Sequence, residues 1–196
     1  MVKFNPTTIT NSTLIFKSVA VNLEMKITIE AETEGDYEKI TRLHTIAFNG
    51  DGEAKLVEKL RKTPRYIREL SLVAKYRNAI IGHALFYPIK IKTCRNICDS
   101  LALAPISVIP RFQNRKVGSR LIKEGLEKAR KLGFKSIIVV GHPKYYPRFG
   151  FEKASKYGIS ASLDVPDDAL FAMELEKDGL KDCKGKIEYP SEYYEA

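Results

Sequence analysis

The segment Leu101–Leu121 reads LALAPISVIPRFQNRKVGSRL. Its apolar first part predicts a buried strand over Leu101–Val108, and a polar turn then leads into a helix that begins at Val117. Pro105 interrupts the strand, and because proline cannot donate a hydrogen bond to the ladder, we expect a bulge or an unpaired strand edge there. The segment therefore indicates a strand–turn–helix unit of an α/β protein.

The helix of this unit extends over Val117–Leu132, where apolar residues recur at helical spacing and charged residues fill the opposite face. After it, Ile137–Gly141 (IIVVG) is a short and fully apolar strand. A strand, a helix and a second strand in this order predict a parallel crossover connection.

The rest of the chain adds strands and helices on both sides of this unit. Alternating side chains predict strands, apolar residues three or four positions apart predict helices, and Asp36 can cap the first helix. The predicted elements are a strand at Lys26–Glu30, a helix after Gly35-Asp36, a helix around Ala54–Leu60, strands at Leu70–Tyr76 and Ile80–Phe86, a helical turn at Tyr145–Phe149 and a strand at Leu170–Leu175. The order β-α-α-β-β-β-α-β-α-β-β predicts a mixed central sheet in a single α/β (or α+β) domain over residues 25–196, with residues 1–24 as an N-terminal extension of unknown role.

The composition is that of an ordinary globular protein, with 44% hydrophobic and 29% charged residues. Because the chain lacks an apolar run long enough to span a membrane, we expect a cytoplasmic protein. The net charge of +9 is uneven: residues 157–196 hold ten acidic and four basic side chains, whereas Arg111–Lys135 holds nine basic residues against Glu124 and Glu127. A basic segment of this kind attracts the phosphates of a nucleotide cofactor or of nucleic acid.

The start of the predicted helix combines the features of an anion site. Its first backbone N–H groups have no partner within the helix, and together with the helix dipole they attract a phosphate or pyrophosphate. Gly118 lies in this first turn and lets a ligand approach the backbone closely. The three cysteines, Cys94, Cys98 and Cys183, lack zinc-ligand spacing, so we expect no metal and idle thiols in a reducing compartment.

Two motifs resemble the GNAT superfamily of N-acetyltransferases. QNRKVG (Gln113–Gly118) is similar to the family's Q/R-x-x-G-x-G/A pattern at a strand-to-helix junction, with Lys116 in place of the first glycine; a lysine there keeps its N–H but must hold an unstrained conformation. VGHPKYYPRFGF (Val140–Phe151) resembles the GDPxYYxRFGF signature of the YhbS-like branch, with His142 where aspartate is usual. The resemblance covers about residues 26–190.

The resemblance implies a single-domain GNAT-like fold that transfers the acetyl group of acetyl-CoA directly onto a primary amine. In such a fold the bulged strand contacts pantetheine, an N–H group of that strand faces the thioester, and basic residues at the helix start meet the cofactor phosphates. The implied cofactor-binding residues are Ile106, Ser107, Val108, Gln113, Asn114, Arg115, Lys116, Val117, Gly118, Ser119, Arg120 and Tyr146, and the N–H of Ile106 or Val108 is the one that faces the thioester.

Acetyl transfer needs a neutral amine, hydrogen-bond donors for the oxyanion and a proton for the departing thiolate. Tyr146 stands where the family has its tyrosine and is the predicted general acid, because a phenol is protonated at neutral pH. Glu53, at the start of the second helix, and His142, after the short strand, are weak candidates for the general base. His44 could equally be a surface residue, and water alone could carry off the amine proton.

Two other functions stay open. Lys116 and His142 depart from the family pattern, which suits a catalytically silent acyl-CoA-binding regulator. A pI of about 9.4 suits a nucleic-acid-binding protein, although the chain shows no aromatic–basic interleaving that resembles a known binding face. The sequence identifies neither the amine acceptor, which is a small molecule or a protein, nor the choice between monomer and homodimer.

Overall fold

The computed structural model describes residues 26–194, and the centre of this part is one mixed sheet. Its strands are β1 (Ile27–Ala31), β2 (Ser71–Tyr76), β3 (Ala79–Thr93), β4 (Ile97–Val108), β5 (Ser136–Val140), β6 (Glu152–Lys153), β7 (Ile159–Ala161), β8 (Leu170–Glu174) and β9 (Gly185–Glu188). Seven of them lie in the order β1-β2-β3-β4-β5-β8-β6, and β9 pairs with both β3 and β7. The pairs β4–β5 and β7–β9 are parallel and the others are antiparallel.

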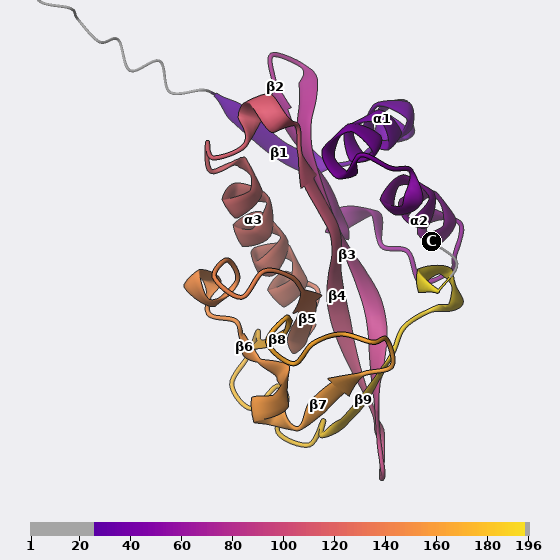
Figure 1. Cartoon of the computed structure of the whole chain (residues 1–196), viewed down its shortest axis with the longest axis vertical. Helices are drawn as coiled ribbons and strands as arrows, with labels where there is room; N and C mark the ends of the chain where they lie inside the picture. Colours follow the sequence, from indigo (N-terminus) through magenta and orange to yellow (C-terminus); the bar gives the residue numbers. More distant parts are fainter. Residues whose placement is uncertain (1–25, 195–196) are drawn as a thin grey trace, which may run out of the picture.

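Helices cover both faces of the sheet (Figure 1). α1 (Tyr37–Phe48) and α2 (Gly52–Arg61) lie on one face, and α3 (Val117–Lys131) lies on the other. Because successive side chains of a strand point to opposite faces, neighbouring residues of β3 belong to different cores: Leu85 packs in the core beneath α2 and Phe86 in the core beneath α3. The predicted mixed α/β fold is confirmed.

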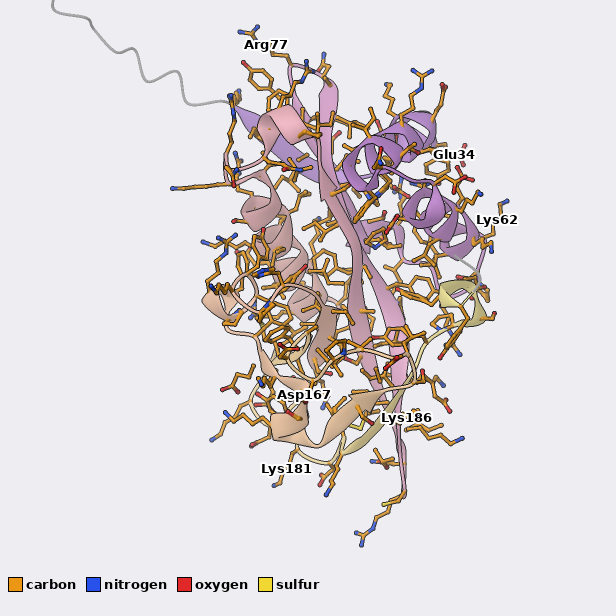
Figure 2. All side chains as sticks on the ribbon, in the orientation of Figure 1. Glu34, Lys62, Arg77, Asp167, Lys181 and Lys186 are labelled. Atoms are coloured by element: carbon orange, nitrogen blue, oxygen red, sulfur yellow. A yellow bond between two sulfur atoms is a disulfide. The ribbon has the colours of Figure 1, made fainter. Side chains whose placement is uncertain are left out.

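Charged side chains project from the periphery of the molecule (Figure 2). All six that the figure labels are exposed to solvent: Glu34, Lys62, Arg77, Asp167, Lys181 and Lys186. This is the arrangement expected when charged groups keep their hydration and apolar groups form the interior.

One cluster of polar residues is nevertheless buried where α1 and α2 meet the sheet. Arg61 of α2 donates two hydrogen bonds to the carboxylate of Glu32, from Nε to Oε1 at 2.6 Å and from Nη2 to Oε2 at 2.7 Å. Glu32 also lies 3.1 Å from Nε2 of His83 on β3, and His83 in turn contacts His44 of α1. His44 is therefore buried, so its interpretation as a surface residue is wrong.

The predicted parallel crossover is confirmed, and it is short. β4 and β5 pair only at Leu101 with Ile137 and at Ala102 with Ile138. β4 continues from there to Val108 along β3, whereas β5 continues beside β8. The two parallel strands consequently diverge, and the gap between them opens toward the start of α3.

The predicted irregularity at Pro105 is also present. The pairing of β4 with β3 shifts register between Ala84 and Phe86, opposite Pro105, and the Ala104–Pro105 peptide bond is cis. A proline lacks the N–H that a regular ladder needs at this point, so the strand bulges here rather than pairing continuously.

Several boundaries differ from the prediction. β3 and β4 are longer than expected, because they also pair with each other over Ile89–Lys92 and Ile97–Ser100, and β9 pairs with β3 over Lys90–Thr93. The predicted fourth helix is a three-residue 3-10 helix, Pro147–Phe149, which starts at a proline and ends at Gly150 in the left-handed conformation. The predicted order has one strand, without bounds, between the helical turn and Leu170–Leu175, whereas the structure has two short strands there, β6 and β7, and β9 follows the strand predicted to be the last.

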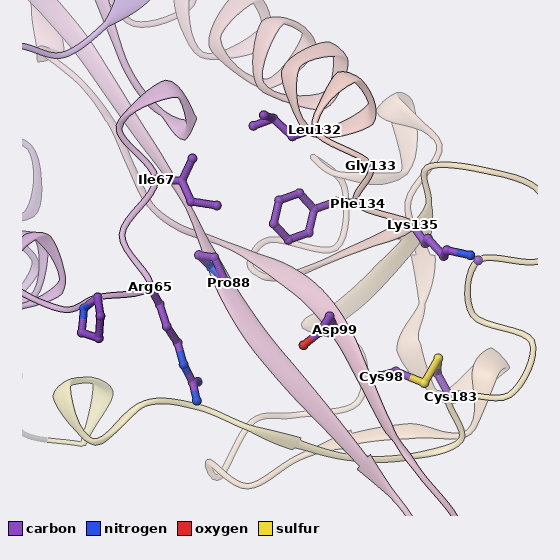
Figure 3. A pocket seen from close by; sticks show the side chains of 12 residues that line it. Arg65, Ile67, Pro88, Cys98, Asp99, Leu132, Gly133, Phe134, Lys135 and Cys183 are labelled. Atoms are coloured by element: carbon purple, nitrogen blue, oxygen red, sulfur yellow. A yellow bond between two sulfur atoms is a disulfide. The ribbon is translucent and has the colours of Figure 1, made fainter.

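The cysteines also differ from the prediction. Cys98 of β4 and Cys183, just before β9, form a disulfide, whereas Cys94 is a free and exposed thiol. The 85 residues that separate the two partners hid the pairing from the sequence. Figure 3 shows a hollow that is lined by Arg65, Asp99 and Phe134 and has the disulfide at one end. Its volume is about 650 Å³. None of the predicted site residues lines this hollow.

Candidate active site

Two hollows lie along the diverging end of β4. The first, which we call the helix-start pocket, has a volume of about 410 Å³ and surrounds the beginning of α3. It is lined by Val108, Phe112, Gln113, Asn114, Lys116, Val117, Gly118, Ser119, Tyr145 and Arg148. Seven of these residues were predicted from the sequence to bind the cofactor.

The backbone of α3 makes the helix-start pocket attractive to anions. The first bond of the helix runs from the N–H of Arg120 to the carbonyl of Lys116, so the three N–H groups before it have no acceptor within the helix. No acidic side chain stands in the first turn of α3 to offset the positive end of the helix dipole. These features suit a phosphate group.

Three residues that line the helix-start pocket were not predicted from the sequence to bind the cofactor: Phe112, Tyr145 and Arg148. The guanidinium of Arg148 lies 4.0 Å from the ring centroid of Tyr145, and its Nη2 donates a hydrogen bond of 3.1 Å to Oγ of Ser119. Arg148 thus adds a positive charge beside the start of α3. Arg148 and Tyr145 are part of the YYPRFGF motif, but the sequence does not reveal that this motif packs against α3.

The second hollow, which we call the strand cleft, has a volume of about 350 Å³ and lies between β4 and β5 where they diverge. It is lined by Phe48, Glu53, Leu56, Ala102, Leu103, Ala104, Pro105, Ile106, Ile138, Val139, Val140, Tyr146, Leu163, Val165, Tyr189 and Tyr193. Leu103 belongs to the core beneath α3 and Ala102 to the core beneath α2. The strand cleft therefore joins the two faces of the sheet.

Backbone donors of β4 face the gap between the strands. The N–H of Ile109 bonds to the carbonyl of Ile81 on β3. Because N–H directions alternate along a strand, the N–H groups of Val108 and Ile106 point the opposite way, toward β5. The outward carbonyl of Val108 accepts a hydrogen bond of 3.1 Å from Nε2 of Gln113, which agrees with this direction.

Tyr146 lines the strand cleft from the α3 side. Its side chain is 6% exposed, and its ring packs against Tyr145 and Phe151 with centroid distances of 5.1 and 5.7 Å. Burial, with a smaller contribution from Tyr145, raises the pKa of Tyr146 to about 12. The phenol is consequently protonated at neutral pH.

Comparison with known proteins identifies the family. The model of the acetyltransferase (GNAT) domain matches residues 28–154. An uncharacterized N-acetyltransferase of Escherichia coli K12, YjhQ, is 36% identical over 142 residues, which cover 72% of this chain and 78% of that protein. The chain belongs to the GNAT family.

Solved structures of other GNAT proteins share the fold. E. coli YhbS in complex with CoA has a TM-score of 0.81 at 27% identity, with 87% of this chain and 93% of that chain covered. A GNAT acetyltransferase of Brucella melitensis in complex with acetyl-CoA has a TM-score of 0.69 at 25% identity, with 86% and 99% covered. Together with the curated relatives, these matches place the chain in the YhbS-like part of the GNAT family.

The GNAT motif departs from the family pattern at Lys116, and the backbone there was predicted wrongly. Lys116 has φ 62° and ψ 12°, which is the left-handed region, and not an unstrained conformation. This region costs a residue with a Cβ atom about 1–2 kcal/mol. Lys116 therefore adopts a backbone conformation that glycine would adopt without this cost.

Not every residue that was predicted to bind acetyl-CoA lines the helix-start pocket. Nη2 of Arg120 donates a hydrogen bond of 2.7 Å to the carbonyl of Ile27 on β1, and Arg120 is not among the residues that line the pocket. Arg115 lies over the ring of Phe112, 5.8 Å from its centroid. Ser107 is buried, and its Oγ has no partner among residues 26–194.

The two candidate bases lie in different surroundings. Glu53 is half-buried in the first turn of α2 and lines the strand cleft. His142 is exposed, accepts a hydrogen bond of 3.2 Å from the N–H of Lys144, and is not among the residues that line the cleft. The fold therefore favours Glu53 over His142 as a residue near a bound amine.

The part of the GNAT chain that the structure describes has no helix long and apolar enough to cross a membrane. Within residues 26–194, no three His, Cys, Asp or Glu side chains gather in a group that could hold a metal ion.

Proposed function

We propose that this protein transfers the acetyl group of acetyl-CoA directly to a primary amine bound in the strand cleft. The observation that carries the proposal is the placement of two hollows along one strand: Val108 lines the helix-start pocket, and Ile106 lines the strand cleft. The phosphates of acetyl-CoA would be held by the N–H groups at the start of α3, with Lys116 and Arg148 beside them. Solved GNAT relatives that carry CoA or acetyl-CoA support this choice of donor.

The backbone of β4 supplies donors for the oxyanion. The amine nitrogen attacks the thioester carbonyl carbon, a C–N bond forms, and the carbonyl oxygen gains negative charge. The N–H groups of Ile106 and Val108, which point into the gap, stabilise that charge. When the C–S bond breaks, the amide and the thiolate of CoA separate, and the proton released by the amine balances the charge.

Tyr146 acts on the leaving thiolate as a hydrogen-bond donor. With a pKa of about 12, its phenol lies about 3.5 pKa units above an ordinary thiol, so full proton transfer is uphill by about 5 kcal/mol. Donation of a hydrogen bond without transfer carries no such cost. The thiolate becomes a thiol by taking a proton from solvent, which balances the proton that the amine loses.

Glu53 receives the amine proton in this proposal, directly or through water. It is the only carboxylate among the described residues that line the strand cleft. That lining also contains no thiol and no aliphatic hydroxyl, the groups that most often form acyl-enzyme intermediates. Direct transfer between two bound substrates is therefore favoured over a covalent acetyl-enzyme.

Titration calorimetry with acetyl-CoA, followed by initial rates over a panel of amines, tests the proposal. We expect saturable binding of acetyl-CoA, and rate plots in which the lines for different amine concentrations intersect, as direct transfer requires. Parallel lines would indicate an acetyl-enzyme. Binding of acetyl-CoA without acetylation of any amine would instead support the silent acyl-CoA-binding regulator.

A further inference from the structure

We infer that the strand cleft selects a small primary amine carried on an uncharged apolar or aromatic body, and that it rejects amines that also carry a carboxylate. Calling this molecule the acetyl acceptor rests on the proposed function. The binding preference itself follows from the side chains that line the cleft. It does not depend on turnover.

Apolar side chains are exposed at the strand cleft. Phe48 of α1 and Val140 of β5 are 41% and 43% exposed, and they belong to the small set of large apolar residues with this much exposure in the described part of the chain. Both line the cleft. Because exposed apolar surface gathered at a hollow is typical of a ligand site, the body of the ligand is expected to be apolar.

The far wall of the cleft is aromatic. The rings of Tyr189 and Tyr193 pack with centroids 5.0 Å apart, and the hydroxyl of Tyr193 donates a hydrogen bond of 3.5 Å to the carbonyl of Ala104. Burial raises the pKa of Tyr189 to about 12 and raises that of Tyr193 as well, so both phenols stay neutral. This wall offers ring faces to an apolar or aromatic group.

Glu53 is the only Asp, Glu, Lys, Arg or His side chain among the described residues of the cleft lining. A carboxylate in an otherwise apolar hollow attracts an ammonium group and repels a second carboxylate. Among residues 26–194, no Lys, Arg or His lines the cleft to bind an acidic ligand. The single charge therefore selects the amine end of the ligand and excludes amino acids.

Charge and size limit the ligand further. The segment 157–196, which supplies Leu163, Val165, Tyr189 and Tyr193 to the cleft, has ten acidic and four basic residues, whereas the helix-start pocket lies in the basic part of the chain. A cationic acceptor and an anionic donor are thus attracted to different sides of the site. A cleft of about 350 Å³ that must also admit an acetyl group has room only for a small body.

Calorimetry on the CoA-loaded protein with three matched amines tests the inference. The amines are 2-phenylethylamine, propylamine, which lacks the ring, and phenylalanine, which adds a carboxylate. We expect 2-phenylethylamine to bind about tenfold more tightly than propylamine and about a hundredfold more tightly than phenylalanine. Phe48→Ala should reduce the preference over propylamine, and Glu53→Gln should weaken binding of 2-phenylethylamine about tenfold.

Glu38→Gln is the matched control, because Glu38 is an exposed carboxylate on α1 that pairs with Arg42. It should leave every affinity unchanged. Failure of 2-phenylethylamine to bind at millimolar concentration, or equal binding of phenylalanine, overturns the inference even if another amine is acetylated. Binding in the expected order without acetyl transfer supports the inference and contradicts the proposed function.

Discussion

Gly141 leaves the space that the ring of Tyr146 occupies. A Cβ atom at residue 141 would overlap with Cε2 of Tyr146 and would lie 3.1 Å from two further ring atoms. Gly141 directly follows β5, so the end of this strand holds the tyrosine in the wall of the strand cleft. The absence of one methyl group thus decides where the predicted catalytic phenol lies.

Gly141→Ala should displace the ring of Tyr146 and lower both stability and activity. Overpacking of a buried site costs about 1–3 kcal/mol in the free energy of unfolding. Denaturant unfolding and kcat measure the two effects. Gly50→Ala is the control, because a Cβ atom there meets nothing within 4 Å. Equal effects of the two substitutions would show that residue 141 does not position the tyrosine.

Tyr146→Phe should lower kcat by about 10²–10³-fold, the range for the loss of one preorganised donor. Its ring packing stays, so acetyl-CoA affinity should change little. Tyr145→Phe is a useful comparison, because Tyr145 lines the helix-start pocket and should affect KM for acetyl-CoA more than kcat. Full activity of Tyr146→Phe would mean that the thiolate leaves without help from this residue.

Gly118→Asp should weaken acetyl-CoA binding by about 10²-fold or more, because a carboxylate would stand among donors meant for a phosphate. Circular dichroism should stay unchanged, since the nearest atom to a Cβ at this position is a side-chain atom, the hydroxyl oxygen of Tyr145, at 3.0 Å. Gly118→Ala should show an intermediate loss of affinity. Unchanged calorimetric affinity in Gly118→Asp would place the phosphates elsewhere.

Lys116→Gly should raise the free energy of unfolding by up to about 1 kcal/mol, because glycine adopts the left-handed region without a steric cost. Lys116→Val should lower it by about 1–2 kcal/mol, since a β-branched residue fits this region poorly. Chemical denaturation checks both changes. Equal stability of the two variants would contradict the left-handed conformation of residue 116.

The buried histidines should make the fold sensitive to acid. Nε2 of His44 lies 2.8 Å from Nδ1 of His83, and burial, with the nearby His83 and Arg61, lowers the pKa of His44 to about 2. The unfolded chain, whose histidines titrate near pH 6.5, therefore binds more protons below that pH. We expect the free energy of unfolding to fall by about 1.4 kcal/mol per pH unit from this residue as the pH drops below about 6.5.

His44→Gln should remove this part of the slope whatever its effect on absolute stability. His142→Gln is the control, because His142 is exposed and should leave the slope unchanged. Unfolding measured at several pH values below 7 separates the two variants. An unchanged slope in His44→Gln would mean that His44 titrates normally in the folded protein.

Local sequence predicted much of the fold because the relevant signals are short in range. The stripe of α3, the apolar run of β5 and the proline in β4 each act within one element. The extension of β3 and the disulfide between Cys98 and Cys183 instead depend on segments distant in the chain, so neither showed in a periodicity. The position of Lys116 was predicted, but its backbone conformation depends on how the turn closes onto α3.

The sequence by itself determined the alternation of strands and helices, the basic segment at the start of α3 and the position of Tyr146 four residues before a Gly-Phe pair. Hydrogen-bond geometry and side-chain period act over a few residues, which is why these features could be predicted. Only the tertiary structure decided that Arg120 bonds to β1, that Arg148 stands at the helix-start pocket, and that Glu53 and Tyr146 line one cleft. Those relationships arise because β4 and β5 diverge after two residue pairs, and that divergence is set by packing between elements far apart in the chain.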